Sequence, residues 1–187
     1  NVVSLARNIG YTPRSSKSSR ANISFIVNTA SYSVKPQTIT LNKGIVATSR
    51  LFGDENYTFS IMEDITVPVV DDIAFFNNID VYEGTYVTSE FSYNSYDPNQ
   101  RFILDNPNID VSTINVTWKP SEFSSVKRKY RRSDSLFEVD SQSPVYWVQE
   151  IEDERYELIF GDGVFGIALQ EPNFLEVRYL VNNGKNS

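Results

Sequence analysis

The side chains of this sequence that could perform chemistry are carboxylates, amides, hydroxyls and amines, because it contains no cysteine and no histidine. Without these two residues there are no disulfides or thiolate metal sites, and the usual general base and triad imidazole are missing. A Ser–Lys or carboxylate-pair enzyme would survive this loss. The adjacent pairs Glu63-Asp64, Asp71-Asp72 and Asp153-Glu154 do not support one, since neighbouring residues of a strand point to opposite faces. We interpret them as solvated turns and predict no catalytic residues and no enzymatic activity.

The most distinctive local motif is FGDGVFG at residues 160–166. A phosphate-binding loop has glycines that open a helix and a lysine or helix N-terminus facing the phosphates, whereas strand-like sequence flanks this motif on both sides. A calcium loop needs several oxygen ligands, and Asp162 is the only carboxylate within the motif. The motif therefore predicts a structural hairpin between strands at 156–160 and 164–167, with both phenylalanines packed on the core side. We predict no cofactor-binding residues.

Residues 105–110, DNPNID, are rich in side-chain oxygens, and Asp105, Asn108 and Asp110 have a spacing that could present them to a cation. The segment lacks the glycine and the distal glutamate of an EF-hand loop. Asx-Pro sequences are also common turn formers. We predict a turn here and no metal ligands.

A short basic run, KRKYRR, extends from Lys127 to Arg132. Such a run is typical of a patch for nucleic acid or an acidic partner, or of an exposed edge strand whose charges oppose aggregation. The acidic stretch at 150–157 could neutralise it, within this chain or in a neighbouring copy. Because the chain carries a formal net charge of −7, its global field repels nucleic acid. We predict a protein contact or a solvated segment here, and no nucleic-acid partner.

Strands are the elements that must position these residues, because from residue 21 onward apolar and polar side chains alternate as in strands with one buried face. The alternation is clear at 23–27, 38–41, 57–61, 65–69, 114–118 and 175–179. Pro68 indicates an edge strand or a solvent-side position. Glu83-Gly84 predicts a tight turn between strands at 79–82 and 85–87. The pattern predicts a mainly β fold, an antiparallel β-sandwich or open barrel.

A helix is expected only at the start, where residues 2–9 have helical apolar spacing and a glycine and a proline follow. The 187 residues favour one domain, or one domain with an appendage. We assign 1–20 to the end of a helix plus a Ser-rich linker, 21–184 to a β-rich structural domain, and 185–187 to the start of a linker to downstream domains. The first residue is not Met, which we interpret as a piece of a longer parent. No apolar run is long enough to span a membrane, so no membrane insertion is predicted.

Five segments resemble one family when taken together and in order. They are NVVSLARNIGYTPRSSKSSRA at 1–21, DVYEGTYV at 80–87, QRFILDNPNIDVSTINV at 100–116, YELIFGDGVFG at 156–166 and LEVRYLVNNG at 175–184. They resemble the baseplate wedge proteins of contractile-tailed bacteriophages, the gene-product-six group of the wider baseplate-J-like proteins. FGDGVFG with the final strand is the most specific part, and residues 31–73 are only generally similar.

The resemblance implies a structural role. Such proteins pair with other copies of themselves and with other baseplate wedge proteins around the tail hub, in a ring that rearranges when the sheath contracts. It implies a location in the virion tail baseplate, assembly in the host bacterial cytoplasm, and no small-molecule substrate. The family offers no catalytic residues to carry over.

Two other functions compete with this one. A carbohydrate- or receptor-binding β-sandwich module would stack sugars on Trp118 or Trp147, although we expect both residues to lie largely in the core because each is on an alternating strand. A carboxylate-based hydrolase would need two carboxyl groups roughly 5 to 9.5 Å apart in one cleft.

Overall fold

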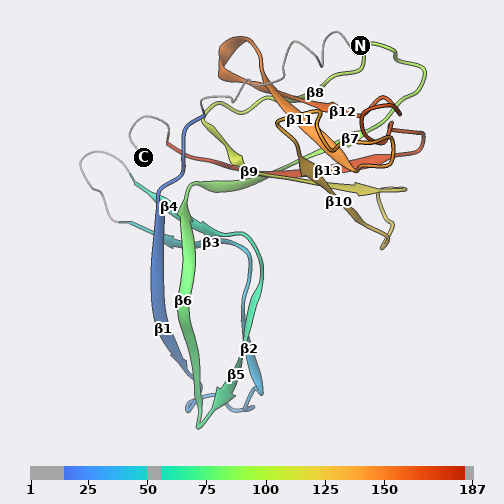
Figure 1. The fold of residues 1–187 in the computed structure, drawn as a ribbon. Coiled ribbons are helices and arrows are strands. Elements are labelled where there is room, and N and C mark those ends of the chain that lie inside the picture. Colours follow the sequence, from blue (N-terminus) through green and yellow to red (C-terminus); the bar gives the residue numbers. More distant parts are fainter. Residues whose placement is uncertain (1–14, 50–55, 184–187) are drawn as a thin grey trace. The chain divides into compact units, whose positions relative to one another are not determined.

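The computed structural model describes residues 15–49 and 56–183 (Figure 1). These residues form two compact units, one built on 17–86 with 182–183 and the other on 87–181 with 15–16. The helix predicted at 2–9 lies outside the described residues, and the proposed boundaries at 20 and 184 stay predictions. Within the described residues, no helix has the length and apolar character needed to cross a membrane.

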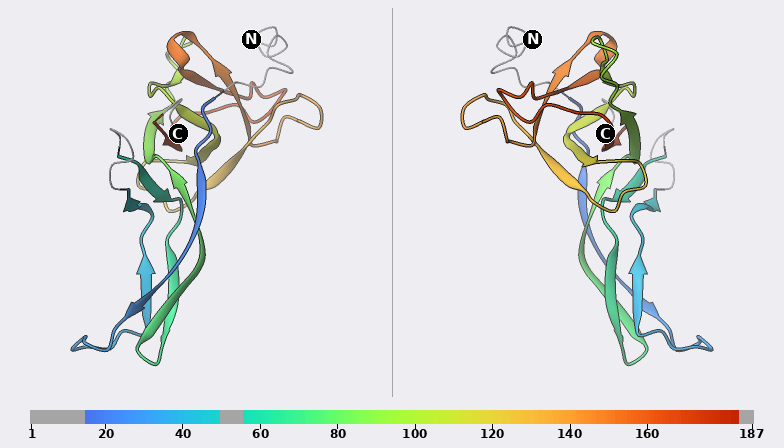
Figure 2. Two further views of the ribbon diagram at one scale, coloured as in Figure 1. Left: turned by 90° about the vertical axis from the view of Figure 1, so that its left-hand side faces the viewer. Right: turned by 90° about the vertical axis from the view of Figure 1, so that its right-hand side faces the viewer.

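The first unit is a six-stranded sheet. Its strands are β1 Arg20–Asn28, β2 Thr38–Leu41, β3 Gly44–Thr48, β4 Thr58–Ile61, β5 Ile65–Val70 and β6 Ile73–Glu83. The sheet order is β2-β5-β6-β4-β3, and β1 pairs with β6 along most of its length. Figure 2 shows these two long strands side by side.

The core of this unit follows the alternation seen in the sequence. Its buried members are Ile61, Ala74, Phe76, Ile79 and Val81, and the inward residues of β1, β2 and β5 pack against them. The β5–β6 connection is the two-residue turn Asp71-Asp72, with φ values of 50° and 63°, as a type I′ hairpin requires. Pro68 is exposed, so its predicted solvent-side position is confirmed.

The second unit is a seven-stranded sheet. Its elements are β7 Thr85–Ser92, β8 Phe102–Leu104, β9 Ile109–Lys119, β10 Arg128–Arg132, β11 Val145–Glu150, the 3₁₀ turn η1 Glu152–Glu154, β12 Tyr156–Phe160 and β13 Phe174–Val181. The order is β7-β13-β9-β10-β11-β12-β8. Phe91 in β7 and Phe102 in β8 meet edge to face with their ring centroids 5.6 Å apart. The two end strands of the sheet thus come together across a shared core, which makes it a nearly closed barrel.

The mainly β class is therefore confirmed, while the predicted barrel describes only the seven-stranded one of the two sheets, and that sheet has one exception to the antiparallel pattern. Strands β10 and β11 run parallel, with Arg131 opposite Val145 and Arg132 opposite Tyr146. A parallel pair cannot be closed by a tight hairpin and needs a longer connection, and residues 133–144 supply it here.

Gly84 marks the passage from one sheet to the other. The two strands predicted on either side of Glu83-Gly84 are present as β6 and β7. The prediction that they form a tight hairpin is wrong, because β6 belongs to the six-stranded sheet and β7 to the seven-stranded one. Gly84 has φ +125°, a conformation open to glycine and strained for other residues. The glycine serves a change of sheet rather than a reversal of the chain.

Candidate functional site

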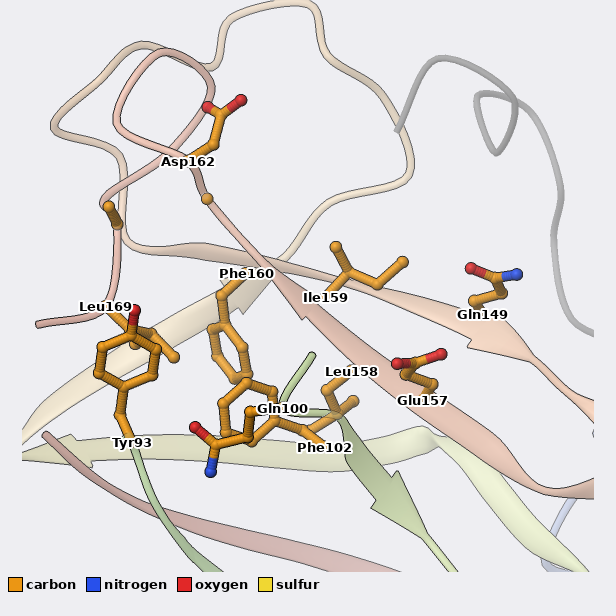
Figure 3. A pocket seen from close by; sticks show the side chains of 12 residues that line it. Tyr93, Gln100, Phe102, Gln149, Glu157, Leu158, Ile159, Phe160, Asp162 and Leu169 are labelled. Carbon is orange, nitrogen blue, oxygen red and sulfur yellow. The ribbon is translucent and has the colours of Figure 1, made fainter. Parts of the chain in front are cut away.

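A groove of about 460 Å³ opens in the barrel unit near β8 and β12. Its apolar wall includes Phe102, Leu158, Phe160 and Leu169, and its polar groups include Tyr93, Gln100, Gln149, Glu157 and Asp162 (Figure 3). Gln100 is fixed by two hydrogen bonds, from its Nε2 to a backbone carbonyl at 2.7 Å and from a backbone amide to its Oε1 at 2.9 Å. The side chain of Gln100 is therefore held in place within the lining of the groove.

Two carboxylates line this groove, at opposite ends of it (Figure 3). Glu157 accepts two hydrogen bonds from the guanidinium of Arg101, at 2.9 and 2.6 Å. Asp162 accepts from the backbone amides of Phe165 and Val164 at 3.0 and 2.9 Å, which lowers the pKa of its carboxyl. Both carboxylates are thus engaged in contacts within the barrel and its loop.

The FGDGVFG loop differs from the predicted hairpin, since no strand forms at 164–167. The loop instead folds on itself and on its neighbour: the Gly163 amide donates to Gly166 at 3.1 Å, and the Gly166 amide donates to the Asp140 carbonyl at 2.8 Å. A Cβ atom on Gly161 would lie 2.3 Å from the Gly166 backbone. The close approach of two backbones, which only glycine permits, takes the place of a strand.

The two phenylalanines of this loop pack on different clusters. Phe160 lies in the main barrel core, with its ring edge to face with Phe102 at 5.2 Å and with Tyr130 at 5.7 Å. Phe165 packs on a separate cluster built on Val145 and its neighbours. The predicted core-side packing is right for Phe160, whereas Phe165 supports the second cluster.

The oxygen-rich segment 105–110 forms a turn whose side chains bind other parts of the barrel. Asn106 Oδ1 accepts the hydroxyl of Tyr179 at 2.6 Å, and buried Asp110 accepts the amide and hydroxyl of Ser112. Asp105 is exposed and pairs with a guanidinium at 3.4 Å. These contacts engage the oxygens with other groups of the barrel, and within 15–49 and 56–183 no group of three or more acidic side chains could hold a metal ion.

The basic run forms β10, which lies inside the sheet. It pairs with β9 on one side and with β11 on the other, so the predicted edge strand is wrong. The reason is the long connection 133–144, which returns the chain alongside β10 in a parallel direction that local sequence does not reveal. Tyr130 points into the core, and its burial raises the pKa of its hydroxyl. Arg132 pairs with Asp134 at 3.1 Å.

The sequence analysis did not predict one buried network of charged side chains. On the face of β13 opposite the core, Glu176 accepts from Lys119 Nζ at 2.6 Å and from Arg178 Nη2 at 2.7 Å. Burial opposes ionisation of Glu176, but the Lys119 hydrogen bond and the Arg178 charge outweigh it and lower the pKa of this carboxyl. The strand alternation placed Glu176 and Arg178 on a polar face, and no sequence signal showed that this face is buried.

The tryptophans offer little stacking surface. Trp147 is buried in the cluster with Val139 and Val145, which confirms its predicted place in a core. Trp118 is partly buried against the main core, and the guanidinium of Arg128 lies 5.6 Å from the centroid of its ring. Sugar stacking on either indole would require one of these contacts to break.

The described part of the chain is thus a pair of β units whose buried charges and polar groups hold the fold, as in a structural module. The family model described as "Bacteriophage baseplate wedge protein gp6, third domain" matches residues 88–182, which begin in β7 and end just after β13. The chain belongs to the bacteriophage baseplate wedge protein gp6 family. A search of curated proteins found no match.

Family membership confirms the resemblance noted in the sequence and gives the protein its broad role. It is a structural protein of the phage tail baseplate, a part of the virion. The matched residues cover the barrel unit, and they include both FGDGVFG and the final strand, the two segments on which the resemblance was most specific.

Proposed function

We propose that the chain mediates the protein–protein contacts that assemble the baseplate wedge around the tail hub. The observation that carries this proposal is the match of the wedge family to residues 88–182, the segment that folds as the barrel. A barrel with a continuous core holds its surface side chains in fixed positions, and rigid complementary surfaces are what specific assembly requires. The partners are other copies of the chain and other baseplate wedge proteins, met in the host bacterial cytoplasm.

The exposed apolar side chains support this proposal. In the six-stranded unit, Ile26 and Phe75 lie opposite each other on neighbouring strands and are 58% and 51% exposed. In the barrel unit, Phe123 and Phe137 are 92% and 86% exposed. Large exposed aromatic side chains are enriched at the centres of protein interfaces. The proposal includes the absence of catalysis, which is supported by the engagement of both groove carboxylates in structural contacts.

The test is a density map of the assembled phage tail, with mass spectrometry of purified tails and purified heads as matched samples. We expect the chain in tails and the seven-stranded barrel in density of the baseplate ring, in contact with wedge proteins. A chain that is absent from purified tails, or whose density lies in the sheath or the head, would refute the proposal.

The groove supports one alternative, a carbohydrate- or receptor-binding module. Aromatic and amide side chains such as Tyr93 and Gln149 are suited to sugar binding. This function predicts binding to a glycan array that is lost in Tyr93→Ala and kept in Trp147→Phe. The assembly function predicts no glycan binding by the wild-type chain.

A further inference from the structure

One exposed face of the barrel combines cations with apolar side chains. This basic face lies at the β9–β10 connection and on the outward side of β10, and its members are Phe123, Val126, Lys127, Lys129 and Arg131. Phe123 is 92% exposed and Val126 is 61% exposed, and the three cations are exposed as well. A projecting aromatic residue on the same connection as exposed cations has the composition of a protein-docking surface rather than of a solvated loop.

The fold presents this face rigidly. Tyr130 is buried in the core between the exposed cations of β10, and β10 is paired on both sides. The connection that carries Phe123 is closed by a backbone hydrogen bond from Ser124 to Ser121 at 3.1 Å, and Ser124 Oγ then accepts the Val126 amide at 3.1 Å. Little conformational freedom is left to lose on docking, which favours binding.

The cations of the basic face have few charge partners of their own. Within the described residues, Lys127, Lys129 and Arg131 form no ion pair within 4 Å. A concentration of positive charge in a chain of net charge −7 is therefore available to an acidic surface.

The β11–β12 connection is a matching acidic face. It consists of Glu150, Glu152, Asp153 and Glu154, followed by one cation, Arg155. Positive φ values at Asp153 and Glu154, 63° and 56°, form a tight turn that leaves the carboxylates of Glu152, Asp153 and Glu154 exposed. Arg155 contacts Asp153 at 3.8 Å and Asp105 at 3.4 Å, so the turn keeps a negative charge.

These two faces lie at opposite ends of the barrel. In the parallel β10–β11 pair, Arg131 is level with Val145, and Glu150 lies five residues further along β11. At about 3.3 Å per residue, Arg131 is ~17 Å and Lys129 ~23 Å from Glu150 along the strands. Figure 1 shows the β9–β10 and β11–β12 connections at opposite ends of the sheet. Charges this far apart are screened from each other at physiological salt, so the faces do not neutralise each other within one protomer.

We propose that the basic face of one copy docks on the acidic face of the next, head to tail. This inference rests on the proposed assembly function and names the contact between copies. A head-to-tail contact joins two different surfaces, so each copy keeps one free face of each kind and the contact propagates into a ring when its rotation closes. The charges steer the encounter and set its direction, and Phe123 supplies the desolvated centre.

The test uses the whole chain with charge reversal on each face. The basic-reversed variant is Lys129→Glu/Arg131→Glu, and the acidic-reversed variant is Glu152→Lys/Glu154→Lys. Sedimentation equilibrium at about 20 mM salt, where the Debye length is roughly 20 Å, measures the association constant. We expect wild-type self-association that weakens with added salt, at least a tenfold loss in either variant alone, and recovery in an equimolar mixture of the two.

Two further samples complete the test. Phe123→Ser changes a fully projecting side chain, so the fold is kept, and we expect a loss of association without a change in salt dependence. A short DNA duplex tests the competing nucleic-acid partner: duplex binding that is lost in the basic-reversed variant and kept in the acidic-reversed variant overturns the proposal. Circular dichroism confirms that each variant is folded.

Several outcomes would overturn the contact. They are a monomeric wild-type chain at low salt, association unaffected by the acidic reversal, and a mixture of the variants that associates no better than each one alone. If one of these is found while the chain still lies in the baseplate density, the head-to-tail contact fails and the proposed function stands. If the chain is absent from the baseplate, the proposed function fails whatever the charge swap shows.

Discussion

Glu176→Gln is the substitution that most directly tests how the fold tolerates a buried charge on the face of β13 opposite the core. Glu176 accepts hydrogen bonds from Lys119 and Arg178 at 2.6 and 2.7 Å, and the side chains of Lys119 and Glu176 are only 9% and 11% exposed. Glutamine has nearly the same shape but no charge. The variant therefore leaves the buried Lys119 and the partly exposed Arg178 without their counter-ion, while the packing of β13 on β9 is kept.

The expected loss is large for a single isosteric change. Removing one partner of a buried ion pair costs about 3–5 kcal/mol because the remaining charge is left uncompensated. Glutamine still accepts one hydrogen bond, so we expect the lower end, about 3 kcal/mol. With an m-value of roughly 2 kcal/mol/M in urea, this corresponds to a fall of about 1.5 M in the unfolding midpoint.

The pH dependence of the folding stability provides an independent test of this account. The pKa of Glu176 is lowered in the folded protein, so its ionised form stabilises the fold at pH values above the unfolded pKa of about 4.3. That contribution is lost as the pH falls through the lower, folded pKa. The difference in stability between wild type and Glu176→Gln should therefore be largest at neutral pH and should decrease below about pH 4.

Urea unfolding followed by tryptophan fluorescence is a suitable assay, because both tryptophans of the chain, Trp118 and Trp147, lie in the barrel unit. Glu90→Gln is the matched control, since Glu90 is exposed and surface changes usually stay within about 0.5 kcal/mol. If Glu176→Gln shifts the midpoint no more than Glu90→Gln, or if the difference widens in acid, the account of the buried network is wrong.

Three further changes test other parts of the barrel. Gly161→Ala places a Cβ 2.3 Å from the Gly166 backbone, and we expect a loss of about 1–3 kcal/mol in urea unfolding, as for other overpacked sites. Tyr146→Phe removes the 2.9 Å hydrogen bond to the Ile114 carbonyl and should cost about 1–2 kcal/mol in the same assay. It should also remove the tyrosine whose pKa burial raises to about 12, which a spectrophotometric titration detects. Asp162→Ala removes the acceptor of two loop amides and should speed their hydrogen exchange with little change in global stability.

Each of these has a result that would contradict it. Gly161→Ala as stable as wild type would mean that the two backbones of the loop can separate freely. A Tyr146→Phe chain with an unchanged midpoint would mean that the Ile114 carbonyl finds another donor. Unchanged exchange of the loop amides in Asp162→Ala would mean that backbone contacts alone hold the loop.

Local features of the sequence predicted strands well and strand partners poorly. The alternation at 38–41 and 65–69 identified β2 and β5 nearly residue for residue, because a strand with one buried face must alternate wherever it lies. The same alternation in the basic run suggested an edge, yet β10 is interior. Exposed cations on one face of a strand do not reveal whether its two backbone edges are paired.

The glycines show the same contrast between what the local sequence predicts and what it does not. The sequence marks Gly84 and Gly161 as places of unusual backbone conformation or close approach, since each breaks an apolar strand pattern. It does not indicate the purpose. Gly84 passes the chain from one sheet to the other, and Gly161 lets the Gly166 backbone approach. Both outcomes depend on segments far along the chain.

The sequence by itself determined that the protein is mainly β, that its chemistry excludes thiol and imidazole groups, and which family it resembles. These properties are local or compositional, so they can be seen without coordinates. Only the tertiary structure decided that the strands divide into two sheets, that Glu176 is buried between two cations, and that the acidic and basic segments lie at opposite ends of the barrel. The reason is physical: burial and the distance between charges are set by the pairing register of strands distant in sequence, which no short segment encodes.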